Sequence, residues 1–74
     1  MAARPLVLPE AYSGETSWED WAFHFENVAA VNEWSAAQKL QWLRVRLTGR
    51  AQRAFQHLSA STRDSYEEAM KALR

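Results

Sequence analysis

Two histidines and two pairs of adjacent carboxylates are the side chains of this sequence best suited to metal or acid–base chemistry. His24 and His57 lie far apart in the chain, and there is no cysteine anywhere in it. A zinc site needs a converging set of three or four ligands, which these residues do not provide. We therefore interpret both histidines as surface residues and predict neither a bound metal nor a cofactor.

Helix electrostatics explains the paired carboxylates better than catalysis does. Glu19 with Asp20, and Glu67 with Glu68, fall in the first turns of expected helices, where negative charge is favoured by the helix dipole. The serines that could act as nucleophiles occur at expected helix starts, where capping accounts for them. Because no nucleophile, base and orienting group can be assembled, we predict no catalytic residues and no enzymatic activity.

Length and charge restrict the remaining classes of function. The 74 residues make one domain at most, with nine basic and nine acidic residues and a formal net charge of zero. Nucleic-acid binders usually carry a basic excess, so we predict no direct binding of nucleic acid. No apolar run is long enough for a membrane span or a signal peptide. The absence of cysteine fits a reducing compartment, and we expect an intracellular, cytoplasmic protein.

Aromatic packing and association remain as the means of stabilising such a small chain. Disulfides are excluded, and small folds without them depend on efficient cores or on oligomerisation. Four tryptophans, three phenylalanines and two tyrosines are a heavy aromatic content for this length. Because each ring can bury about 150–250 Å², the sequence can build a core.

Residues 1–14 show no helical period and are expected to form an extended arm. Pro5 and Pro9 bracket an apolar triplet, and each proline disfavours helix in the residue before it. A serine and a glycine at 13 and 14 predict a turn. The alternative is a disordered tail. If the arm is ordered, its expected anchors are Leu6, Leu8 and Tyr12.

Capping signals divide residues 15–74 into about four short helices. The first begins at Thr16 or Ser17, each followed three residues later by an acidic side chain. The second begins at Ser35 with a glutamine at the same spacing, and Gly49 is expected to be its left-handed C-cap. The apolar stripes of these two helices are Trp18, Trp21, Ala22, Phe25, Val28 and Ala29, followed by Leu40, Leu43 and Leu47.

Two shorter helices are expected beyond residue 49. The third carries Ala51, Phe55 and Leu58 on one side, and the hydroxyl-rich run at 59–62 is expected to break it. The fourth begins at Ser65, again with a capping-box spacing. The predicted fold is therefore all-α: a compact bundle of about four short helices at 15–74, preceded by the arm. Because the chain ends at Arg74 without a C-cap, we expect a fragment of a longer protein.

The order of these motifs resembles the capsid N-terminal lobe of gypsy-type retrotransposon Gag proteins, including domesticated Arc-like and paraneoplastic-antigen-like members. The proline, aromatic, small residue and glycine at 9–14 resemble the lead-in of that family. Residues 18–29 resemble its first capsid helix, and residues 32–35 resemble its helix junction. The leucine-x-glycine-x-alanine passage at 47–51 and the segment 65–68 extend the match over nearly the whole chain.

This resemblance implies a retroviral capsid N-lobe fold and a role in assembly. Such lobes pack side by side into the hexamers and pentamers of a shell, and Arc-like lobes take a short hydrophobic peptide or their own arm into an interhelical groove. A full Gag protein usually adds a C-lobe and often a cysteine–histidine zinc knuckle. Neither is present in this sequence.

Several large apolar residues and a group of arginines are candidates for an oligomer interface. Phe23 and Ala30 lie off the apolar stripe of the first helix, and Trp42 and Val45 point away from that of the second. The alternative is that the second helix is packed on two sides. Arginines at 44, 46, 50 and 53 form either a solvated face or a contact with an acidic face of the next subunit. The candidate interface comprises Phe23, Ala30, Trp42, Val45, Arg46 and Arg50.

The inner aromatic residues of the first helix admit two interpretations. Trp18, Trp21 and Phe25 form either plain core or the wall of a groove that takes a peptide or the arm, together with Leu6, Leu8 and Tyr12. We predict a structural self-association module of a Gag-like capsid protein, with other copies of itself as partners in capsid-like particles. The alternative is an adaptor that binds a short hydrophobic peptide.

Overall fold

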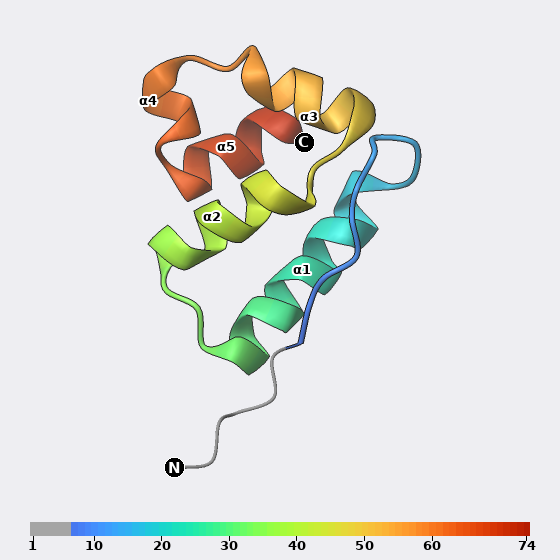
Figure 1. Ribbon diagram of the computed structural model, residues 1–74, viewed down its shortest axis with the longest axis vertical. Helices are drawn as coiled ribbons and strands as arrows, with labels where there is room; N and C mark the ends of the chain where they lie inside the picture. Colours follow the sequence, from blue (N-terminus) through green and yellow to red (C-terminus); the bar gives the residue numbers. More distant parts are fainter. Residues whose placement is uncertain (1–6) are drawn as a thin grey trace.

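The computed structural model describes residues 7–74, and these residues fold into five α-helices (Figure 1). The helices are α1 (Trp18–Asn32), α2 (Ala36–Arg46), α3 (Gly49–Gln56), α4 (Ala60–Arg63) and α5 (Tyr66–Leu73). The described residues contain no β-strand, only one isolated parallel bridge between Tyr12 and Leu47. The predicted all-α fold is confirmed.

Serine side chains begin four of the five helices. Each accepts a hydrogen bond from the backbone N–H three residues later, which satisfies a donor that the first helical turn leaves free. At Ser35 the capping box is complete, because the Gln38 side chain also accepts a hydrogen bond from the Ser35 N–H. At the first helix, Ser17 rather than Thr16 is the cap. The four capping residues are Ser17, Ser35, Ser59 and Ser65.

Two expectations about helix boundaries are wrong. The run at 59–62 does not simply end a helix, because the Ser59 hydroxyl caps the short helix α4. Gly49 has a left-handed φ of 52° but is the first residue of α3, not the C-cap of α2. The end of α2 is instead set by Leu47, whose backbone is extended. Leu47 and Thr48 are extended because the arm pairs with them, an interaction that no local pattern predicts.

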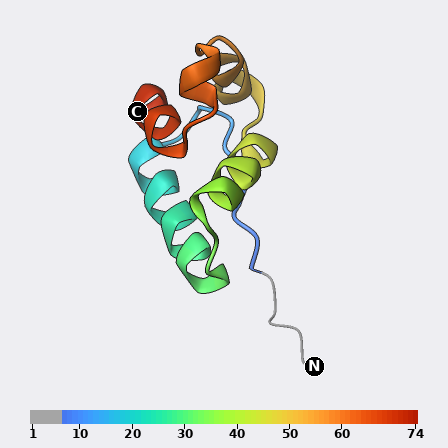
Figure 2. The same ribbon diagram turned by 90° about the vertical axis from the view of Figure 1, so that its left-hand side faces the viewer.

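The core lies where the inner faces of the helices and the end of the arm meet. Figures 1 and 2 show α1 and α2 joined at one end of the molecule, with α3, α4 and α5 gathered towards the opposite end. Helix α5 contacts α2, α3 and α4. Phe25 and Leu43 are completely buried. The main buried cluster consists of Tyr12, Trp21, Phe25, Leu40, Leu43, Leu47, Ala51, Phe55, Tyr66 and Ala69.

A polar triad joins three helices at the edge of this core. The Tyr66 hydroxyl of α5 donates to Glu26 Oε2 of α1. Lys39 Nζ of α2 lies 3.3 Å from Glu26 Oε1 and 5.3 Å from the centre of the Tyr66 ring. Burial of the phenol, together with its bond to Glu26, raises the pKa of Tyr66 far above its ordinary value.

This raised pKa predicts a loss of stability in alkali. Above about pH 10 the unfolded chain releases the Tyr66 proton, whereas the folded chain retains it, so the free energy of unfolding falls as pH rises. Tyr66→Phe removes this dependence, because phenylalanine has no proton to lose. Thermal unfolding measured between about pH 9 and about pH 11 checks the difference in slope. Equal slopes for the two proteins would show that Tyr66 does not titrate differently on folding.

Candidate functional site

The carboxyl end of the arm is held by backbone hydrogen bonds to the junction between α2 and α3. The Tyr12 N–H donates to the Arg46 carbonyl, and the Thr48 N–H donates to the Tyr12 carbonyl, both at 2.8 Å. The Ala51 N–H donates to the Ser13 carbonyl at 3.1 Å. The arm is thus bound as one strand binds the edge of another, although the partner is a helix junction.

Side chains of α1 hold the earlier part of the arm. Trp21 Nε1 donates to the Glu10 carbonyl at 2.7 Å. The Asn32 amide forms two bonds with the backbone of Val7, donating to its carbonyl at 2.6 Å and accepting from its N–H at 3.1 Å. Figure 1 shows the arm running beside α1 over most of the helix length. An extended segment is therefore bound along a helix through its backbone.

Aromatic rings connect the arm to the centre of the core. The Tyr12 ring lies 5.3 Å from Trp21 and 5.4 Å from Trp18, measured between ring centres, and Trp21 stacks on Phe25 at 5.1 Å. Tyr12, Trp21 and Phe25 are buried, and Trp18 is half-buried. Trp21 and Phe25 of the expected groove therefore belong to the core, whereas Trp18 lies at its edge.

The three residues expected to anchor the arm differ in whether their side chains are buried. Leu6 lies outside the described residues, Tyr12 is buried, and Leu8 is 52% exposed. The expectation that Leu8 anchors the arm is wrong, because Pro9 is the fully buried side chain. Neighbouring side chains of an extended segment point to opposite sides, so burying Pro9 turns Leu8 outward. Reading Pro9 only as a helix breaker missed its packing role.

The apolar interface candidates divide into exposed and covered residues. Phe23 is 71% exposed, Val45 is 63% exposed, and Ala30 is also exposed. Phe23 and Ala30, two helical turns apart, share the outer face of α1. Trp42 is half-buried, because its ring stacks on Trp34 with centres 5.1 Å apart and planes within 6°. Trp42 thus packs within the fold on the side of α2 away from Leu40, Leu43 and Leu47, which favours the alternative that α2 is packed on two sides over an interface role for this ring.

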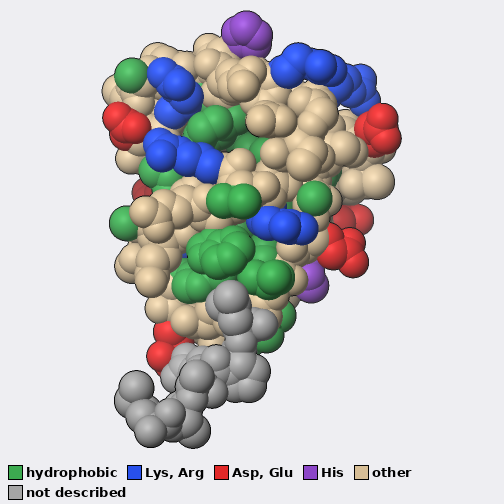
Figure 3. All heavy atoms as spheres, viewed as in Figure 1, with side chains coloured by type: hydrophobic (Ala, Val, Ile, Leu, Met, Phe, Trp, Pro, Cys, Tyr) green, Lys and Arg blue, Asp and Glu red, His purple; other side chains and the backbone are tan. Residues whose placement is uncertain are grey.

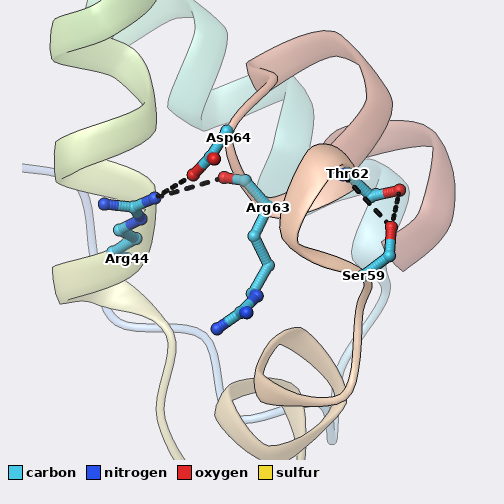
Figure 4. A network of polar contacts seen from close by, with 5 residues as sticks. All are labelled: Arg44, Ser59, Thr62, Arg63 and Asp64. Atoms are coloured by element: carbon cyan, nitrogen blue, oxygen red, sulfur yellow. Dashed lines mark hydrogen bonds and ion pairs between the residues drawn. The ribbon is translucent and has the colours of Figure 1, made fainter.

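The arginines likewise differ in burial and in the number of contacts that they make within the fold. Arg44 donates to the Arg63 carbonyl and pairs with Asp64 at 3.4 Å, joining α2 to the end of α4 (Figure 4). Arg46 is half-buried with its Nε enclosed, whereas Arg50 and Arg53 are exposed. Arg50 donates one bond, at 3.3 Å, to the Gly14 carbonyl. The α3 arginines thus keep most of their donors available.

A cleft of about 330 Å³ with a mixed polar and apolar lining lies between the turn after the arm, the start of α1, α3 and the end of α5. Its walls include Trp18, Leu58 and Leu73, with Arg50 also in the lining. Tyr12 and Trp18, two of the expected groove residues, lie in its lining. The sequence did not predict that α3 and the end of α5 would complete it, because no local pattern indicates their approach to the first turn of α1.

The residues considered for metal or acid–base chemistry do not come together. His24 is exposed on α1 and His57 is exposed just after the end of α3, and residues 7–74 hold no cluster of three or more potential metal ligands. The paired carboxylates occupy the first turns of α1 and α5. None of the described helices has both the length and the apolar character needed to cross a membrane.

Comparison of the chain with protein-family models, with curated proteins and with solved structures finds no match.

The bond between Trp21 and the arm can be tested by substitution. Trp21→Phe leaves the Glu10 carbonyl without its indole donor and removes part of a buried ring, so we expect a loss of about 1–3 kcal/mol in the free energy of unfolding. Urea denaturation measures the loss, and faster amide exchange at Tyr12 and Ala51 would locate it to the arm. Trp18→Phe is the matched control, because Trp18 makes no hydrogen bond to the described arm. Equal effects of the two substitutions on these amides would contradict the assignment.

Proposed function

We propose that this chain is a structural self-association module of a retrotransposon-derived, Gag-like capsid protein, and that it contributes to the assembly of a capsid or virus-like particle. The observation that carries the proposal is the exposed phenyl ring of Phe23. It lies on the side of α1 opposite the buried residues Trp21, Phe25 and Val28. The fold therefore does not use this ring, although the chain has few other means of gaining stability.

Burial of Phe23 against a second copy would be favourable. Covering a phenylalanine side chain contributes about 1.5–3 kcal/mol, and aromatic residues are enriched in the centres of protein interfaces. Ala30 lies on the same face of α1 and is small enough to allow a neighbouring backbone to approach. The outer face of α1 thus combines an aromatic anchor with a small residue.

The Gag-like part of the proposal is supported by the order of the sequence motifs and by the type of fold. An extended segment precedes a helix-only domain, as the resemblance implies. We also propose that the assembled particle is intracellular and located in the cytoplasm, in keeping with the absence of cysteine.

Phe23→Ser is expected to weaken self-association about tenfold or more, because it removes the apolar anchor from the contact. Little change in folding stability is expected, since the ring is exposed. Sedimentation over a range of protein concentrations measures association, and thermal unfolding measures stability. Leu8→Ser, which also removes an exposed apolar side chain but from the arm, is the control. A wild-type protein that stays monomeric at every concentration and salt condition would rule out the proposed function.

A second function, that of a peptide-binding adaptor, is favoured by the way the arm is held. Its backbone is bonded to α1 and to the α2–α3 junction, which is how such a site would hold an extended ligand. In this case the arm occupies the site, and an external peptide must displace it.

A synthetic peptide of residues 5–16 tests the adaptor function. The tethered arm competes at an effective concentration on the order of 1 mM, so the peptide is expected to bind the wild-type protein weakly. Pro9→Ser, which loosens the arm by removing its fully buried side chain, is expected to tighten binding about tenfold. Tryptophan fluorescence, followed during titration, measures both affinities. Failure of the peptide to bind the Pro9→Ser protein, with its helix content intact, would exclude an exchangeable site.

A further inference from the structure

The neutral chain separates its charges by helix. The charged residues of α1 are the three acids Glu19, Asp20 and Glu26. The charged residues of α2 and α3 are all basic: α2 has three and α3 has two. The separation is therefore three negative charges on α1 against five positive charges on α2 and α3, counting histidine as neutral. A net charge of zero conceals this polarity.

Part of this charge is used within the fold. Glu26 pairs with Lys39, and Arg44 pairs with Asp64. Within residues 7–74, the exposed Glu19 and Asp20 of α1 and the exposed Arg50 and Arg53 of α3 form no ion pair. Two acids and two arginines thus remain available to a partner.

The available acids lie one helical turn before the exposed ring of Phe23. Glu19 and Asp20 precede Phe23 by four and three residues, the spacings at which side chains of a helix are neighbours. We call Glu19, Asp20, Phe23 and Ala30 the acidic face. It combines an apolar centre with charge of one sign.

The available arginines belong to a second surface. We call Val45, Arg46, Arg50 and Arg53 the basic face; it spans the end of α2 and the length of α3. Figure 3 shows Lys and Arg side chains spread over the half of the molecule that holds these helices, with Asp and Glu at its margins. The exposed Val45 supplies an apolar contact on this face as well.

We propose that copies of this chain associate head to tail, with the acidic face of one copy on the basic face of the next. This proposal rests on the self-association proposed above and adds the surfaces and the symmetry. A two-fold contact that joined either face to itself would bring like charges together, which is unfavourable. A contact between two different faces leaves one of each free on every pair, so it continues into a ring or a filament.

Charge reversal tests the pairing of the two faces. Glu19→Lys with Asp20→Lys makes both faces positive, and Arg50→Glu with Arg53→Glu makes both negative. Each double variant alone is expected to associate about a hundredfold more weakly than the wild type, because its faces repel. An equimolar mixture is expected to recover association, because each face then meets its complement on the other variant. Sedimentation at low salt measures all four samples, and added salt is expected to weaken the wild-type and mixed assemblies.

Glu67→Lys with Glu68→Lys is the matched control. These acids also follow a serine N-cap in a first helical turn, so the substitution changes net charge by the same amount, and it additionally removes the ion pair between Glu68 and Lys71. It lies outside both faces, and association is expected to match that of the wild type. Circular dichroism shows whether each variant retains its helices.

The possible outcomes distinguish a failure of the proposed head-to-tail contact from a failure of the proposed self-association. A wild-type protein that associates while the folded mixture of variants stays monomeric would overturn the head-to-tail contact and leave self-association standing. A wild-type protein that is monomeric at every concentration and salt level would overturn both. If the arginine variant loses binding to single-stranded RNA but associates as the wild type does, the basic face serves nucleic acid and the proposal is wrong.

Discussion

The docking of the arm onto α1 and the α2–α3 junction is the contact on which the rest of the structure depends. The buried Tyr12 ring places the arm against Trp21, which stacks on Phe25 in the centre of the core. The backbone of Tyr12 also fixes Leu47 and Thr48 as an extended link, and that link sets where α2 ends and α3 begins. A small domain without disulfides has little apolar surface to spare, so recruiting an extended segment into the core is a physical necessity of this fold.

The side chains fall into two groups: those that make contacts within the fold, and those that stay exposed and could contact a partner. Trp34 and Trp42 cover one another at the edge of the core, and Glu26, Lys39 and Tyr66 satisfy one another where three helices meet. What remains outside these contacts is an exposed aromatic ring among acids on α1 and a group of arginines on α3. These exposed side chains are the ones that the proposed self-association would use.

Helix starts could be predicted because their capping bonds are local. The features of the site that depend on contacts between distant residues could not. A serine cap bonds to an N–H only three residues away, so its signal lies within one short stretch of sequence. The position of Gly49 and the covering of Trp42 depend instead on residues 12–13 and on Trp34, and neither relation has a sequence spacing that identifies it. The outward position of Phe23 was predictable, because helical periodicity alone separates it from the buried stripe.

The sequence by itself determined the helical class, the serine-capped starts of α1, α2 and α5, the apolar stripe of α1 and the separation of acidic from basic helices, because each follows from composition or from contacts within one helical turn. Only the tertiary structure decided that Pro9 rather than Leu8 is buried and that Tyr12 joins the core. It also decided which charges are paired and which remain available. These outcomes depend on residues distant in the chain, whose approach is set by the packing of the whole domain.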